Sequence, residues 1–177
     1  MSTGNAESAA VELLAVVKKS IRADAEFAVT PKPDGVSLKN WSIFDPTALP
    51  DETKLDTIAA CAAIPVLNRG MGSIVGMAIG DAVGHPLEFG DVVDEPDPNH
   101  RYDPHSLNYT GPFNKFSLKP GQWTDDASMG LCIADSLLCK ERYNGADMRA
   151  RFWNWWFRGY NNAFRFDTQN QGTSCGL

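Results

Sequence analysis

The chain has 177 residues, 43% of them hydrophobic and 21% charged, which is enough for one soluble globular domain with a real core. Its formal net charge of −6 argues against nucleic-acid binding, which needs a basic face. No run approaches the roughly 20 apolar residues of a membrane helix, and no basic residues precede the first apolar block as they would in a secretory signal. We expect a cytoplasmic protein with no nucleic-acid or membrane partner.

The first 68 residues are predicted to form a helical extension with a proline-rich linker, and residues 69–177 to form a separate unit. Residues 6–28 show helical spacing of apolar side chains, and residues 30–50 hold four prolines. A further helix is expected from Asp51 to about Leu67, kinked or shortened by Pro65 and separated from the next helix by Gly70. Its inward face is predicted to contain Leu55, Ile58, Ala59 and Ala62.

A glycine stripe follows, in which glycines recur every four residues at Gly72, Gly76, Gly80 and Gly84. Residues four apart share one helix face, and glycine costs roughly 1 kcal/mol per site there relative to alanine. Such a face is expected where another backbone or a ligand approaches closely. Asp81 sits beside this face, either within a site or as a buried, hydrogen-bonded carboxylate. Glu88 follows Pro86, which stops the helix.

Residues 89–122 are predicted to be irregular because prolines and glycines recur throughout them. His100 and His105 lie there, five apart, and a solvated loop explains them better than a metal site does. The four cysteines form no Cys-x-x-Cys pair and are expected to be reduced, with Cys132 and Cys139 packed in a core.

Thr124, Asp125 and Asp126 are expected to open a helix that runs to about Lys140 and buries Met129, Ile133 and Leu137. Thr124 is a favourable N-cap residue. Two interpretations of the aspartates stay open. They complement the helix dipole, or they form with the threonine oxygen a hard-oxygen cluster for Mg²⁺.

An aromatic helix is predicted from Asn144 or Asp147 to about Tyr160, with Phe152, Trp156 and Tyr160 in the core. The segment 161–167 after it is both polar and aromatic. It either stacks on a base or ribose or closes the helix end.

Together, two motifs resemble the ADP-ribosylglycohydrolase family: Gly76 to Glu88 (GMAIGDAVGHPLE) and Trp123 to Met129 (WTDDASM). The resemblance extends to Gly159–Asn162 and covers about residues 70–177. It implies an all-α orthogonal helical bundle, here incomplete at its C-terminus, with two Mg²⁺ or Mn²⁺ ions between helices. Members of this family cleave the glycosidic bond between ADP-ribose and a side chain, often arginine. The implied partner is an ADP-ribosylated protein or a small ADP-ribosyl conjugate.

The resemblance also implies roles for individual residues. Thr124, Asp125 and Asp126 would ligate the metals, and Glu88 and Asp126 would be catalytic. The residues implied to contact substrate are Gly84, Glu88, Tyr160, Asn161, Asn162 and Phe164.

The sequence departs from the family pattern in two ways. The second metal motif, an Asp-x-Asp-Thr-like segment, has no counterpart, since Asp167–Thr168 lacks the partner aspartate. Ala127 stands where the family often has threonine. The missing ligands are therefore expected from a further C-terminal segment or a second chain. Three alternatives stay open: an inactive fragment, a non-catalytic ADP-ribose-binding or crystallin-like relative, and a glycine-striped helical oligomer without a ligand.

Overall fold

The computed structural model describes residues 3–22, 42–43, 49–89, 101–103, 105–106, 108–110 and 118–162. These form five α-helices: α1 (Thr3–Lys19), α2 (Asp51–Ala63), α3 (Pro65–Gly84), α4 (Asp125–Lys140) and α5 (Gly145–Arg158). A 3₁₀ turn, η3 (His85–Leu87), extends α3. The strands β1 (Arg101–Asp103) and β2 (Asn108–Thr110) pair antiparallel with Tyr102 opposite Tyr109. The prediction of an all-α fold is confirmed. The β1–β2 pair corrects the expectation that residues 89–122 are wholly irregular.

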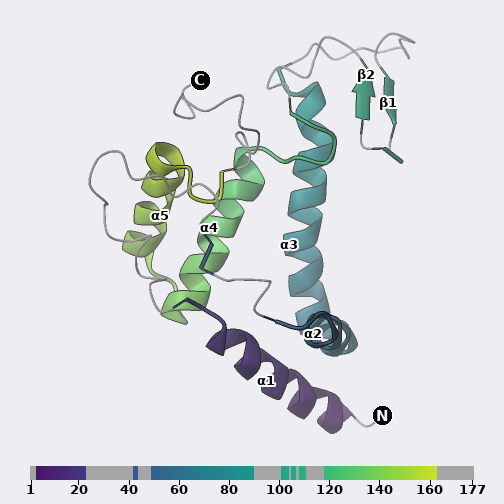
Figure 1. Ribbon diagram of the computed structural model, residues 1–177, viewed down its shortest axis with the longest axis vertical. Coiled ribbons are helices and arrows are strands. Elements are labelled where there is room, and N and C mark those ends of the chain that lie inside the picture. Colours follow the sequence, from purple (N-terminus) through teal and green to yellow (C-terminus); the bar gives the residue numbers. More distant parts are fainter. Residues whose placement is uncertain are drawn as a thin grey trace.

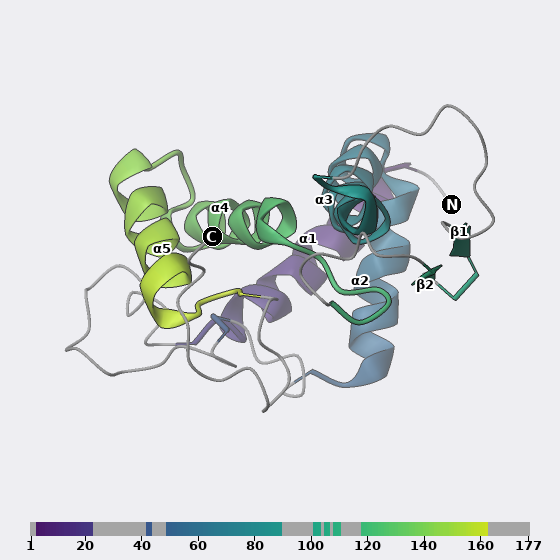
Figure 2. The ribbon, with the colours of Figure 1, turned by 90° about the horizontal axis from the view of Figure 1, so that it is seen from above.

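The helices pack in chain order, each against the next (Figure 1). α3 and α4 lie side by side and run antiparallel, so the end of α3 meets the beginning of α4 (Figures 1 and 2). α2 meets α3–η3 at a bend of 116°. In the described ranges no single helix is long and apolar enough to cross a membrane, although this bent pair passes by length and composition.

The boundary between α2 and α3 lies at Ile64 and not at Gly70, so that expectation was wrong. Pro65 is the first residue of α3, where its missing N–H costs nothing because no helical partner exists for it. Ile64 has the extended backbone that a following proline favours (φ −107°, ψ 114°). Leu67 and Gly70 are therefore interior residues of α3.

The predicted inward face of α2 was also wrong. No residue of this helix is buried, and Leu55 and Ile58 are 66% and 52% exposed. The helical spacing is present, but no described segment covers this face.

The buried face of α4 differs from the prediction as well. Ile133 and Leu137 are exposed, whereas the i, i+4 line of Ser128, Cys132 and Ser136 is fully buried. The small side chains on this line let α4 and α5 approach closely, which a pattern search for large apolar residues does not detect.

The core comprises Ile43, Cys132, Trp155 and Tyr160, and Ile21, Met129, Cys139, Phe152 and Trp156 pack against it. The predictions that the α5 aromatics and the two α4 cysteines serve packing are thus confirmed. Burial raises the pKa of the Cys132 thiol to about 12, so this sulfur is protonated at neutral pH.

The glycine stripe of α3 does not face a partner among the described residues. A Cβ built at any of its four glycines would meet no atom within 4 Å. The close approach of α3 to another helix occurs instead at Gly130 of α4, where an added Cβ would lie 2.2 Å from the sulfur of Met77. The small residue needed at this crossing therefore lies on α4.

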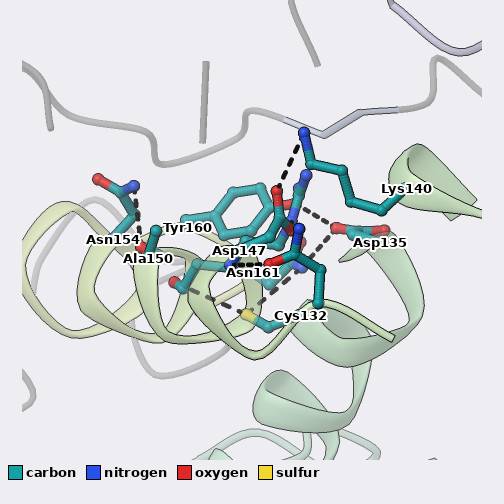
Figure 3. Close-up of polar contacts among 10 residues, drawn as sticks. Cys132, Asp135, Lys140, Asp147, Ala150, Asn154, Tyr160 and Asn161 are labelled. Carbon is teal, nitrogen blue, oxygen red and sulfur yellow. Dashed lines mark hydrogen bonds and ion pairs between the residues drawn. The ribbon is translucent and has the colours of Figure 1, made fainter. Parts of the chain in front are cut away.

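A buried polar network joins α4 to α5 (Figure 3). The fully buried Arg151 donates from Nε to Asp147 Oδ2 at 2.6 Å and from Nη1 to the Tyr160 hydroxyl at 2.9 Å. Tyr160 donates in turn to Asp135, which also accepts from Asn161 Nδ2 at 2.9 Å. The network fixes the end of α5 and the two residues after it against α4.

Charge pairing sets the protonation of Asp147 in this network. Burial acts to raise its pKa, but the interactions with Arg151, Ser136 and Lys140 together outweigh burial and hold the pKa below its ordinary value. Asp147 Oδ1 also lies 3.6 Å from Lys140 Nζ. Because the pKa is lowered by folding, this pairing stabilises the fold at neutral pH, and the contribution is lost as the pH falls through the folded-state pKa.

Arg151→Ala is expected to lower the free energy of unfolding at pH 7 by about 3–5 kcal/mol, because it leaves the Asp147 carboxylate buried without its main partner. The deficit should shrink as the pH is lowered, because protonation of Asp147 removes the unpaired charge from the variant. Urea unfolding at several pH values measures both effects. Arg149→Ala, at an exposed site on the same helix, is the control and should change stability by less than about 0.5 kcal/mol. An equal effect of the two variants would contradict this account.

Candidate active site

The beginning of α4 is held by a side chain from α3. Thr124 occupies the N-cap position as predicted, but its hydroxyl makes no capping bond to its own helix. Instead, Asp81 accepts hydrogen bonds from the Thr124 amide at 2.9 Å, the Thr124 hydroxyl at 2.6 Å and the Ala127 amide at 2.8 Å. The carboxylate of Asp81 thus satisfies amide groups that a helix beginning leaves unpaired.

These bonds favour one of the two readings of Asp81. A carboxylate that accepts from three donors is a structural, hydrogen-bonded group at the contact between two helices. Sequence reasoning placed Asp81 beside the site but could not identify its partners, because they lie 43 and 46 residues further along the chain.

Glu88 and the Asp125–Asp126 pair converge at this same end of α3 and α4. Glu88 follows η3 and is half-buried. Burial raises the pKa of its carboxyl group, and charge repulsion from Asp125, Asp126 and Asp81 raises it further. No cationic side chain of the described residues contributes to that shift. This end of the α3–α4 pair is therefore electronegative.

The oxygen atoms of this site could supply some of the ligands of a hard divalent cation. Thr124 is 2% exposed, Asp125 is half-buried and Asp126 is exposed, so oxygen donors are available at different depths. Among the described residues, no three His, Cys, Asp or Glu side chains are grouped as a complete metal site would require. Thr124, Asp125 and Asp126 thus offer part of a ligand shell, and metal binding stays a prediction.

The predicted substrate residues fall into two groups. Gly84 is the exposed last residue of α3 and, with Glu88, lies at the acidic end. Tyr160 is fully buried in the α4–α5 network and exposes no surface to a ligand, and Asn161 donates to Asp135 in the same network (Figure 3). Asn162 is 8% exposed. Phe164 lies outside the described residues.

His85 is a residue of this region that the sequence reasoning did not single out. It is 5% exposed, its Nδ1 lies 3.1 Å from the Ala82 carbonyl oxygen, and burial lowers its pKa. The imidazole is therefore neutral at pH 7. Its position between Gly84 and Pro86 was the only available signal, and a histidine at a helix end does not by itself predict burial.

Comparison with known proteins identifies the class. The profile of the ADP-ribosylglycohydrolase family matches residues 62–176, and the chain belongs to this family. It is 32% identical over 127 residues to the ADP-ribosylarginine hydrolase Tri1 of Serratia proteamaculans, covering 72% of this chain and 29% of that protein.

Two further relatives agree. The ADP-ribosylarginine hydrolase Tri1 of Pseudomonas putida is 36% identical over 115 residues, which cover 63% of this chain and 28% of that protein. The ADP-ribosyl-[dinitrogen reductase] glycohydrolase of Rhodospirillum rubrum is 34% identical over 93 residues, which cover 51% of this chain and 29% of that protein. The chain thus spans less than a third of the length of these relatives. No solved structure matches it significantly.

The convergence of the acidic groups predicts that Asp125→Asn or Asp126→Asn lowers the pKa of Glu88, because each substitution removes a nearby negative charge. Carbon-13 NMR titration of the Glu88 carboxyl group measures this directly. Because folding raises the pKa of Glu88, ionisation of this group lowers the free energy of unfolding as the pH rises from its unfolded-state pKa through its folded-state pKa. Both variants should make this decrease smaller. Asp56→Asn on α2 is the control and should leave the Glu88 titration unchanged. A Glu88 pKa equally unaffected by all three variants would show that the carboxyl groups lie apart.

Proposed function

We propose that this chain carries part of the active site of a metal-dependent hydrolase that cleaves the glycosidic bond between ADP-ribose and a protein side chain, with arginine as the acceptor. The single observation that carries this proposal is geometric: Asp81 binds the beginning of α4 by hydrogen bonds, so Glu88 and the Asp125–Asp126 pair lie at the same end of the antiparallel α3–α4 pair. Family membership and the names of the two Tri1 relatives support the reaction class and the choice of arginine.

Glu88 is the proposed acid–base group. Burial and three neighbouring carboxylates raise its pKa, which brings a glutamate closer to the pH at which it both gives and takes a proton. A glutamate in this state can protonate a leaving group or accept a proton from an attacking water. Asp126, the more exposed aspartate of the pair, is proposed to act with it by stabilising the positive charge that develops on the ribose.

Thr124, Asp125 and Asp126 are the residues proposed to hold Mg²⁺ or Mn²⁺. The Thr124 hydroxyl donates its proton to Asp81, so its lone pairs stay available to a cation. When bound, two divalent cations orient ribose hydroxyls and lower the pKa of water. Because the sequence has no Asp-x-Asp-Thr-like segment, we propose that the remaining ligands come from a further segment or a second chain.

The test is release of ADP-ribose from ADP-ribosyl-arginine by the natural gene product, with Mg²⁺ or Mn²⁺ present. Glu88→Gln, Asp125→Asn and Asp126→Asn should each lower kcat by on the order of 10²-fold or more, since each removes an acid–base group or an oxygen donor. Asp56→Asn removes an exposed carboxylate on α2 and should leave kcat within about twofold of the wild type.

Three results would overturn the proposal. Turnover that is insensitive to chelation and to all three site variants would remove the metal-dependent mechanism. Calorimetric binding of ADP-ribose without turnover would instead identify a non-catalytic binding relative, and no heat with either ADP-ribose or Mg²⁺ would favour a helical structural protein.

A further inference from the structure

The cross-helix bonds of Asp81 connect the two halves of the acidic site. Through its side chain, Asp81 accepts from Thr124 and Ala127 at the beginning of α4. Through its backbone carbonyl, it accepts from the His85 amide, and the His85 carbonyl accepts from the Glu88 amide at 3.1 Å. One residue thus joins the segment that carries Glu88 to the segment that carries Asp125 and Asp126.

The packing next to Asp81 adds a second fixed point. Met77 lies one turn before Asp81 on the same face of α3, and Gly130 lies one turn after Ala127 on α4. The sulfur of Met77 occupies the space that a Cβ on Gly130 would fill, 2.2 Å away. Contacts at two successive turns restrict both the separation of α3 and α4 and the rotation of α4 about its axis.

We propose that Asp81 is a positioning residue: its carboxylate fixes the first turn of α4 so that Asp125 and Asp126 face Glu88. A cap from within α4 would pair the same amide groups but would not fix the orientation of α4 relative to α3. Here the N-cap hydroxyl of Thr124 is itself a donor to Asp81, so the orientation of α4 depends on a neighbouring helix. The inference rests on the proposed function, because it assigns Asp81 a role in that site.

The test compares two cap variants. Asp81→Ala removes the cross-helix cap of α4. Asn144→Ala removes the local cap of α5, in which the Asn144 side chain accepts from the Asp147 amide at 3.0 Å. Both remove capping bonds, but only Asp81 lies between the two halves of the acidic site. A role limited to capping predicts that each variant frees amide groups only at the start of its own helix and leaves the orientation of α4 relative to α3 unchanged.

Hydrogen exchange and residual dipolar couplings of the backbone amides give the first readout, with no metal or substrate present. In Asp81→Ala, the Ala127 amide should exchange at least about tenfold faster, and the couplings of the first turn of α4 should change relative to those of α3. In Asn144→Ala, both quantities should stay at wild-type values in α4. Unchanged exchange and couplings in Asp81→Ala would overturn the proposal.

The second readout is the affinity of the natural gene product for Mn²⁺, measured by electron paramagnetic resonance. We expect at least a tenfold loss of affinity in Asp81→Ala and less than a twofold change in Asn144→Ala. Equal affinities in the two variants, with α4 visibly displaced only in the first, would reduce Asp81 to a structural residue. If the wild type neither binds Mn²⁺ nor turns over substrate, the proposed function is wrong. The exchange rates and couplings would still show whether Asp81 fixes the position of α4.

Discussion

The structure of the acidic site depends on a carboxylate that replaces a local helix cap. Asp81 projects from α3 and pairs the amide groups at the beginning of α4, so two helices separated by about 40 residues of chain share one fixed contact. The antiparallel arrangement then follows, because the end of one helix must meet the start of the other. This contact, together with the packing of Met77 against Gly130, places Glu88 and the Asp125–Asp126 pair at the same end of the two helices.

The second fixed region of the described chain is the α4–α5 contact. Here a polar network lies beside the apolar core: Arg151, Asp147 and Asp135 are held with Tyr160 in one hydrogen-bonded network (Figure 3). α4 is therefore constrained on two sides, by Asp81 at its beginning and by this network along its buried face. The exposed glycine face of α3 carries no comparable contact among the residues described.

Sequence patterns predicted the helices well where local chemistry decides them. Asn144 caps α5 as its side chain predicts, because this cap depends on residues within one turn. Thr124 also stands at the start of α4, but there Asp81 of α3 pairs the amide groups. Buried faces were predicted poorly. Leu55 and Ile58 have helical spacing but remain exposed, and the true α4 interface uses Ser128, Cys132 and Ser136. Helical periodicity shows which residues share a face, but not which face meets another helix.

The motifs grouped Glu88, Asp125 and Asp126 into one predicted site, and the structure places them at the same end of the α3–α4 pair. The motifs did not predict the hydrogen bonds of Asp81, because its partners lie 43 and 46 residues further along the chain. The burial of His85, whose ring contacts the Ala82 carbonyl, was not predicted either. Tyr160 also makes contacts that the sequence did not predict. Its hydroxyl is hydrogen-bonded to Arg151 and Asp135 inside the core, and its predicted contact with substrate stays a prediction.

The most direct test of the central claim is a paramagnetic titration. Substoichiometric Mn²⁺ added to the isotope-labelled natural gene product should broaden the NMR signals of Thr124, Asp125, Asp126 and Glu88 before any others, because all four would surround one cation site. Broadening that begins elsewhere, or that reaches the aspartates but leaves Glu88 sharp, would contradict a shared site at the α3–α4 pair.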